Sequence, residues 1–321
     1  MNGRVVLAYS GALASSVALR RLAGTGAEVI AVTVDVGRGD ALATVRERAL
    51  ACGAAEALVV DARDEFAERY CLPALRANAL HGPLLPALTR PLLAEHLVRA
   101  AERHGATAVA HDLAAADRAG VDAGVAALAP HPTVLPPDHE PPRTRHDLRG
   151  RAARPGPVRT GPAYSVPADT CEVVVTFDRG VPVALDGETV TAFQAIRELD
   201  LKAGRHTVRG VRQALGALAL TTAHRELETV TLEHETARFK RQVDRRWGEL
   251  VRDGQWSSPL RHALDGFLET TRRHVTGEVR LLLHDGRATV TGLRREQAPH
   301  DHAPAGRGWG HPHDQSKRDQ G

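Results

Sequence analysis

Short apolar runs alternate with longer amphipathic stretches over the first 130 residues. The runs that predict strands are residues 5–8, Glu28–Val34, Ala57–Val60 and Thr107–Ala110. The stretches that predict helices begin at Ser15 or Ser16 and cover Leu42–Cys52, Asp64–Ala79 with an interruption at Pro73, and Pro91–His104. This alternation predicts an α/β domain whose parallel sheet is covered on both faces. Ligands of such sheets bind at the carboxyl ends of the strands, so the loops Ser10–Ser15, Asp35–Gly37 and His111 onwards are expected to share one cleft.

A different pattern follows in the second half of the chain. Two alternating runs, Cys171–Phe177 and Val181–Leu185, flank a turn and predict a hairpin. Helices are predicted over Thr191–Leu199, His224–Arg252 and Pro259–Val275, and two closing strands over Gly277–His284 and Arg287–Gly292. The pattern predicts an α+β domain with long C-terminal helices. Periodicity alone leaves open whether the longest helix packs on its own domain or on another subunit.

A change of composition separates the two halves. Residues 130–167 contain ten prolines, many arginines and few apolar residues, and predict a poorly ordered linker. We therefore expect one domain over residues 1–129, a second over 168–295, and a disordered tail over 296–321. The tail carries His300, His302, His311 and His313. His-x-His pairs can hold zinc, but a solvated tail without a metal is the preferred interpretation.

Charge and composition exclude several classes of protein. The 42 basic and 39 acidic residues give a formal charge of +3, and aromatic residues make up only 3%. A dedicated nucleic-acid binder concentrates its positive charge, so none is expected here. Three widely spaced cysteines favour a reducing compartment. No apolar run approaches the ~20 residues that span a bilayer, and the N-terminus has no secretory-signal pattern. These features predict a soluble, cytoplasmic protein without a membrane partner.

The first strand leads into a loop of small residues, Ser10–Ser16, and then into a helix. Small residues let the backbone approach a ligand closely. The N-terminus of a helix offers unpaired N–H groups and a partial positive charge, which favour a phosphate. A strand–helix turn that binds nothing is the alternative. Asp35, Asp61 and Asp186 are interpreted as cap, turn or surface residues, and His111 as a hydrogen-bonded structural residue rather than a catalytic one.

The loop resembles the PP-loop of ATP pyrophosphatases, S-G-G-x-D-[ST]-S, and within that superfamily the A-Y-S-G-G-L-D-T-S of argininosuccinate synthases. Ala12 stands at the second glycine and Ala14 at the aspartate. The segment Phe177–Gly187 is similar to the family's F-x-x-G-x-P-V-A-L-[DN]-G. Further family-like segments follow in the same order: Glu28–Gly37, Val60–Ala67, Pro73–Leu80, Arg90–Ala94, Arg238–Lys240, Asp253–Leu260 and Val275–Leu281. On this resemblance, over about residues 3–125 and 170–295, the chain is identified as a divergent member of the argininosuccinate synthase family.

The resemblance implies a nucleotide-binding domain, a synthetase domain and a homotetramer assembled through long C-terminal helices. It implies ATP with Mg²⁺ as cofactors, and citrulline and aspartate as the substrates that are ligated through a citrullyl-AMP intermediate in arginine biosynthesis. The nucleotide-binding residues that it implies are Ala8, Tyr9, Ser10, Gly11, Ser15, Ser16 and, through its backbone, Val34.

The remaining family motifs have lost most of their characteristic residues. The family's G-x-[ST]-G-K-G-N-D-Q-x-R-F-E run is replaced by Asp112–Asp122, which puts the carboxylate of Asp112 where a phosphate is expected. The family's R-Y-P-L tyrosine has no counterpart in His81–Leu84, and Pro162–Val166 retains only the start of its S-P-Y-S motif. Catalytic residues therefore cannot be assigned, and impaired turnover is expected. Three hypotheses stay open: an altered C–N ligase, a catalytically degenerate oligomeric partner or regulator of an active relative, and a nucleotide-binding module.

Overall fold

The computed structural model describes residues 3–37, 42–82, 84–113, 115–129, 132–135, 170–204, 215–284 and 287–295. The tail over 296–321 and the segment Pro162–Val166 lie outside the described residues. So does most of the expected linker over 130–167. Within that linker, Thr133–Val134 forms a short strand, which the sequence did not predict.

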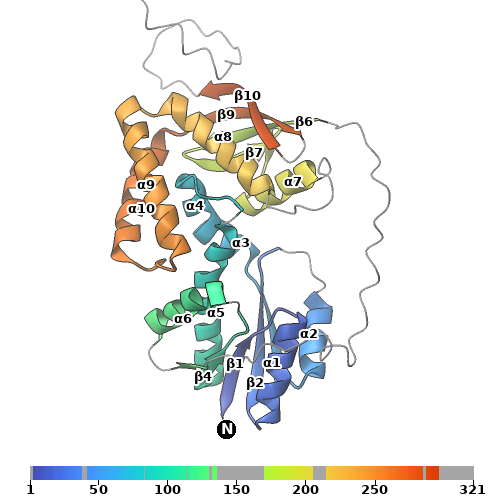
Figure 1. The fold of residues 1–321 in the computed structure, drawn as a ribbon. Coiled ribbons are helices and arrows are strands. Elements are labelled where there is room, and N and C mark those ends of the chain that lie inside the picture. Colours follow the sequence, from blue (N-terminus) through green and yellow to red (C-terminus); the bar gives the residue numbers. More distant parts are fainter. Residues whose placement is uncertain are drawn as a thin grey trace, which may run out of the picture.

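The first half of the chain builds a parallel five-stranded sheet in the order β3-β2-β1-β4-β5 (Figure 1). Val6 of β1 lies beside Ile30 of β2 on one side and Val109 of β4 on the other. The predicted parallel α/β architecture is confirmed. The strands are β1 (Arg4–Ala8), β2 (Glu28–Asp35), β3 (Glu56–Asp61), β4 (Ala108–Ala110) and β5 (Thr133–Val134).

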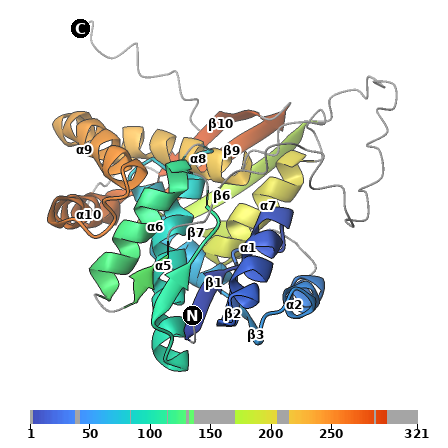
Figure 2. The ribbon, with the colours of Figure 1, turned by 60° about the horizontal axis from the view of Figure 1, so that its bottom comes forward.

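Helices cover both faces of this sheet, because alternate residues of β1 point to opposite sides. Leu7 packs in one cluster with Leu19 and Val45. Val6 packs in another with Leu97 and Val125. Figure 2 shows the two helix pairs on opposite sides of β1. They are α1 (Leu13–Gly24) with α2 (Leu42–Ala51), and α5 (Leu85–His104) with α6 (Ala115–Leu128).

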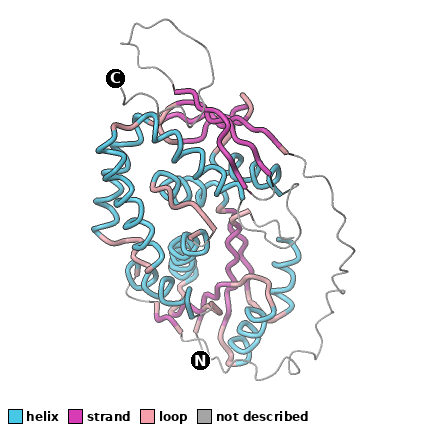
Figure 3. Tube along the Cα trace, turned by 45° about the horizontal axis from the view of Figure 1, so that its top comes forward, coloured by secondary structure: helices cyan, strands magenta, loops and turns pink. Residues whose placement is uncertain are grey.

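The second half builds an antiparallel sheet in the order β10-β9-β6-β7-β8, with long helices packed against it (Figure 3). The predicted α+β character is confirmed. The strands are β6 (Cys171–Asp178), β7 (Val181–Leu185), β8 (Glu188–Thr189), β9 (Gly277–His284) and β10 (Arg287–Arg295). The helices are α7 (Ala192–Gly204), α8 (Leu215–Thr231), α9 (His234–Arg252) and α10 (Pro259–Thr271), and a 3₁₀ turn follows over Arg272–His274. Among the described helices, none is both long and apolar enough to cross a membrane.

The single helix predicted over His224–Arg252 is wrong, because α8 ends at Thr231 and α9 begins at His234. Glu233 between them adopts an extended conformation with ψ 145. Its carboxylate accepts hydrogen bonds from the backbone N–H groups of Glu235 and Thr236. These bonds satisfy donors that the first turn of a helix leaves unpaired. A carboxylate cap therefore starts a new helix where the apolar periodicity continues.

Two prolines are tolerated inside helices. The predicted helix over Asp64–Ala79 is α3 (Arg63–Phe66), a π-helical turn (Ala67–Cys71) and α4 (Leu72–Arg76). Pro73 lies in the first turn of α4, where its missing N–H costs little. Helix α5 begins at Leu85 rather than at the predicted Pro91, which lies within it. Helix α6 was not predicted.

Residues from the first half contribute to the core of the second. One buried cluster contains Leu75 and Leu92 together with Phe177 and Leu281 of the antiparallel sheet. The ring of Tyr70 stacks on Trp256 at 4.9 Å between centroids. The two sheets are therefore joined by a common core along α3, α4 and the start of α5. The limits of the two expected domains stay a prediction.

A buried lysine connects this segment to α8 and α9. Lys240 Nζ donates to the backbone oxygen of Arg76 and to Asp244 Oδ1, both at 2.7 Å, and lies 2.9 Å from Glu228 Oε1. Asn78 Nδ2 donates to both carboxylates, at 2.6 Å to Glu228 and 2.9 Å to Asp244. Burial raises the pKa of Asp244 to about 6 and also raises the pKa of Glu228, while Lys240 opposes both shifts.

We expect Lys240→Met to lower the free energy of unfolding by about 3–5 kcal/mol, because it leaves two carboxylates buried without their cation. Arg241 is exposed and one residue further along α9. The matched substitution Arg241→Met should change stability by less than ~0.5 kcal/mol. Urea unfolding of both variants measures the difference, and equal small effects would show that the buried lysine does not hold the segment in place.

Candidate functional site

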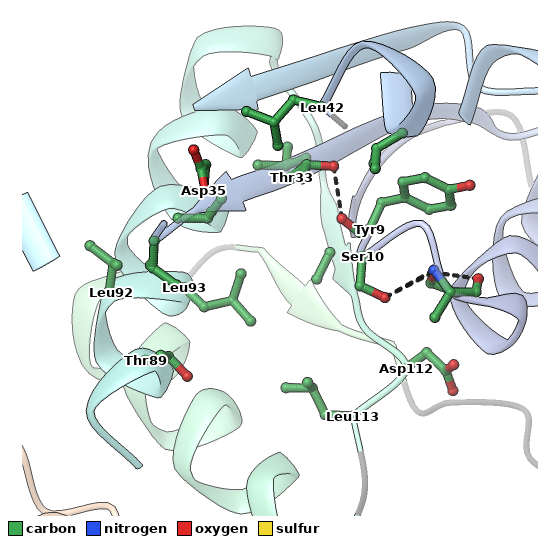
Figure 4. Close-up of a pocket in the computed structure, with 17 residues that line it drawn as sticks. Tyr9, Ser10, Thr33, Asp35, Leu42, Thr89, Leu92, Leu93, Asp112 and Leu113 are labelled. Atoms are coloured by element: carbon green, nitrogen blue, oxygen red, sulfur yellow. Dashed lines mark hydrogen bonds between the residues drawn. The ribbon is translucent and has the colours of Figure 1, made fainter. Parts of the chain in front are cut away.

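A cavity of about 450 Å³ lies at the carboxyl ends of β1, β2 and β4 (Figure 4). Its volume is in the range of small-molecule sites. The three loops predicted to share a cleft do so, which confirms that prediction. The lining residues are Ala8, Tyr9, Ser10, Ala12, Ser15, Val32, Thr33, Val34, Asp35, Val36, Leu42, Val45, Thr89, Leu92, Leu93, Asp112 and Leu113.

The loop after β1 keeps an unstrained backbone despite its two alanines. Gly11 has φ 75, a conformation that favours glycine, and a Cβ there would lie 3.1 Å from Val45 Cγ2. Ala12 has φ −71 and ψ 163, which any residue adopts. The alanine at the second glycine position of the PP-loop pattern therefore imposes no backbone strain.

The serine hydroxyls of the loop bond to the loop itself. Ser15 Oγ and Ser16 Oγ donate to the backbone oxygen of Ala12, at 3.0 and 2.9 Å. The hydroxyl of Tyr9 lies 2.9 Å from Ser16 Oγ, and that of Ser10 lies 3.2 Å from Ser15 Oγ. Ser15 and Ser16 already donate to the backbone oxygen of Ala12. The hydroxyls of Tyr9 and Ser10 are therefore the donors in these two pairs. The hydrogen bonds of these hydroxyls stabilise the conformation of the loop after β1.

The groups of this loop that are still available to bind an anion are the first backbone N–H groups of α1. This helix begins at Leu13. Such groups have no partner within their own helix. Ser16 N makes the first helical bond, to Ala12 O at 3.0 Å. The first turn of α1 contains no acidic residue, so no side chain of its own helix opposes an anion there.

Apolar side chains form the opposite wall of the cavity. Leu92 and Leu93 come from α5, and Leu113 follows β4 (Figure 4). Val34 lines the same space from β2. Sequence reasoning missed the α5 contribution, although the family-like segment Arg90–Ala94 contains both leucines. This wall suits the apolar face of a flat ring.

Two carboxylates and no basic side chain line the cavity. Asp35 follows β2 and accepts a hydrogen bond from Gly37 N at 2.8 Å, with Arg63 3.9 Å away. Asp112 follows β4. Among the lining residues, all of which belong to the described part of the chain, none is Lys, Arg or His. The described part of the lining therefore supplies no cation to a bound anion.

The candidate residues from sequence fall into two groups. Ala8, Tyr9, Ser10, Ser15 and Val34 line the cavity. Gly11 and Ser16 lie in the same loop without lining it, and both shape the turn. That these residues bind a nucleotide stays a prediction.

The other polar residues singled out from sequence have structural partners. His111 is buried, and its Nε2 lies 2.7 Å from Asp122 Oδ1 of α6. Asp61 pairs with Arg63. Asp186 has φ 51 and accepts a bond from Val174 N, as expected of a turn residue.

The carboxylates do not form a metal centre. No group of three or more His, Cys, Asp and Glu residues that could hold a metal occurs within the described ranges. Mg²⁺ is commonly held by one or two carboxylates together with substrate phosphates. The residues that the structure describes thus offer no magnesium site made by the protein alone.

A second, smaller cavity of about 230 Å³ lies between the end of α4 and α9. Asn78, His81, Asp244 and Arg252 are among its lining residues. It borders the buried Lys240 cluster and is separate from the strand-end cavity.

We expect Gly11→Ala to destabilise the protein by about 1–2 kcal/mol, because an L-residue is strained at positive φ and its Cβ would contact Val45. Ala12→Gly, one residue away, should cost less than ~1 kcal/mol, because only chain entropy changes. Thermal unfolding of the pair measures the contrast. Equal costs would indicate that the loop has another conformation.

Two family models match the chain. The model of the arginosuccinate synthase N-terminal HUP domain matches residues 4–154, and that of the arginosuccinate synthase C-terminal domain matches residues 159–317. A solved structure of a universal stress protein in complex with cAMP aligns with 42% of this chain and 96% of its own, at 18% identity and a TM-score of 0.25. That likeness carries no argument about function. The two family models together span almost the whole sequence, and the chain belongs to the argininosuccinate synthase family.

Proposed function

We propose that this chain binds an adenine nucleotide in the strand-end cavity and ligates citrulline with aspartate poorly or not at all. The cavity carries the first part of the proposal. It lies where the PP-loop pattern, the start of α1 and an apolar wall meet. Membership of the argininosuccinate synthase family makes ATP the ligand to test first, and citrulline and aspartate the substrates.

The run after β4 supports the second part. Ligation through an adenylate needs groups that stabilise a leaving pyrophosphate and clamp both amino acids. Here Asp117 pairs with Arg90 at 2.7 Å and Asp122 pairs with His111 at 2.7 Å. Both carboxylates hold α6 against its neighbours. Losses of groups that act together reduce turnover far more than a single loss does.

Nucleotide binding predicts that AMP, or ATP with Mg²⁺, raises the unfolding temperature. A ligand at tenfold its Kd stabilises the folded state by about 1.4 kcal/mol. Pyrophosphate release in the presence of citrulline and aspartate should stay at the level of a no-enzyme control. No thermal shift with either nucleotide at millimolar concentration would contradict the binding proposal, and sustained pyrophosphate release would contradict the impaired ligation.

A second candidate is a role as an oligomeric partner, and exposed apolar residues on the C-terminal helices favour it. Phe239 of α9 is 53% exposed and Leu260 of α10 is 46% exposed. Phe239 packs edge-to-face on Phe267 at 5.3 Å between centroids. Exposed apolar side chains that gather on one surface often mark a protein–protein interface. A homotetramer, or a hetero-oligomer with an active relative, would cover Phe239 and Leu260.

We expect the protein to be an oligomer in solution, so that its mass, measured by light scattering, is at least twice the chain mass of 34.4 kDa. Phe239→Glu should lower that mass, because it places a charge in the contact. Leu201 of α7 is also 53% exposed, and Leu201→Glu provides the matched control, which should leave the mass unchanged. A wild-type monomer would contradict assembly through these helices.

A further inference from the structure

An aromatic ring from the second half of the chain lies against the turn that follows β2. A Cβ built on Gly37 would lie 2.6 Å from Phe193 Cε2 and 2.9 Å from Phe193 Cζ, closer than real Cβ atoms approach another atom. The ring therefore occupies the place that a side chain at Gly37 would take. Phe193 belongs to the first turn of α7, whose buried residues pack with the antiparallel sheet. The contact joins α7 to the end of β2.

The backbone of this turn is held from two sides. Gly37 has φ 90, a conformation that L-residues rarely adopt. Its N–H donates to Asp35 Oδ1 at 2.8 Å, a bond that closes the turn. The Phe193 ring packs on the same residue. The conformation of the turn thus depends on one contact from within the turn and on one contact from α7.

Arg63 packs on the same ring and reaches the same turn. Its guanidinium carbon lies 5.8 Å from the centroid of the Phe193 ring, and a cation over an aromatic face is attracted to it. Arg63 Nε lies 3.9 Å from Asp35 Oδ2. Two shorter bonds, of 2.8 and 2.6 Å, join the guanidinium to Asp61 at the end of β3. Phe193 therefore contacts both the turn after β2 and the arginine that follows β3.

The turn that Phe193 contacts is also a wall of the strand-end cavity. Val34, Asp35 and Val36 line the cavity, and Gly37 is the next residue. Val34 and Val36 also pack against the buried cluster that includes the antiparallel sheet. Removing the ring would leave the turn without its support from α7. A ligand that has to order a loop binds more weakly than one that meets a preformed wall.

We propose that Phe193 is a positioning residue for the strand-end cavity, through which α7 keeps residues 34–36 in the conformation that binds the nucleotide. Phe193 is not among the described residues that line the cavity, so it acts through Gly37 and not by touching the ligand. The inference rests on the proposed binding of an adenine nucleotide. Because coupling between two sites is reciprocal, a nucleotide in the cavity should also stabilise the start of α7.

The test is isothermal titration of the full chain and its variants with AMP. We expect Phe193→Ala to weaken AMP binding by roughly fivefold or more, because the ligand then has to order the turn. Phe193→Leu keeps part of the apolar contact, and its affinity should fall between those of the wild type and Phe193→Ala. Unfolding temperatures measured without ligand check that the variants are folded.

Ile196→Ala is the matched control on the same helix. Ile196 is half-buried, and it packs against the same core as the rest of α7. Its truncation should lower the unfolding temperature, because it loosens the packing of α7. AMP affinity should change by less than ~2-fold, since the Phe193 ring stays against Gly37. The pair of variants separates a role in positioning from a role in stability alone.

A double-mutant cycle tests whether Phe193 acts through Gly37. Gly37→Ala places a methyl group where the ring lies and strains the backbone at positive φ. The backbone strain is the same with and without the ring, so it cancels in the cycle. The steric conflict disappears when residue 193 is alanine. The double variant should therefore bind AMP at least ~3-fold more tightly than the product of the two single losses predicts.

Hydrogen–deuterium exchange supplies the reciprocal measurement. AMP should slow exchange at residues 192–196 in the wild type and not in Phe193→Ala. If Phe193→Ala binds AMP as tightly as the wild type, the proposed nucleotide binding survives and the role of Phe193 does not. Equal losses in Phe193→Ala and Ile196→Ala, or single losses that multiply in the cycle, would also overturn that role. A wild type that does not bind AMP would contradict both proposals.

Discussion

The site depends on one topological constraint, the reversal of strand order between β1 and β4. These strands are neighbours in the parallel sheet, but α1 leaves β1 on one face while the chain after β4 continues into α6 on the other. Parallel sheets bind ligands in the crevice that such a reversal leaves. The loop of small residues, the start of α1 and Asp112 are all brought together by this crevice.

The crevice is also coupled to the second half of the molecule. Leu92 lines the cavity and belongs to the core that contains the antiparallel sheet. The preceding segment is fixed by Asn78, which contacts Glu228 and Asp244, and by the buried Lys240. The pKa of His224 falls well below its usual range because of burial and nearby Lys240, so the ring stays neutral beside this cluster. The wall of the cavity is therefore supported by residues from the C-terminal helices, far away in sequence.

Local sequence patterns were sufficient to predict the fold class. They were not sufficient to predict the long-range polar contacts. Apolar alternation and the PP-loop-like segment predicted the parallel sheet and the shared cleft, because both depend on neighbours in sequence. The break at Glu233 was missed because the apolar periodicity runs across it. The α5 wall was missed because Pro91 suggested a helix start where the chain was already helical. The Lys240 cluster joins residues that are 150 and 164 positions apart, which no local pattern reveals.

We propose that this chain holds an adenine nucleotide in the strand-end cavity. Hydrogen–deuterium exchange of the full chain with and without AMP tests it most directly. We predict slower exchange over residues 8–16, 33–36 and 89–93, which surround the cavity. Exchange should be unchanged at 77–81 and 244–252, which border the smaller cavity beside α9. Slower exchange confined to the second set, or no change in the first, would contradict it.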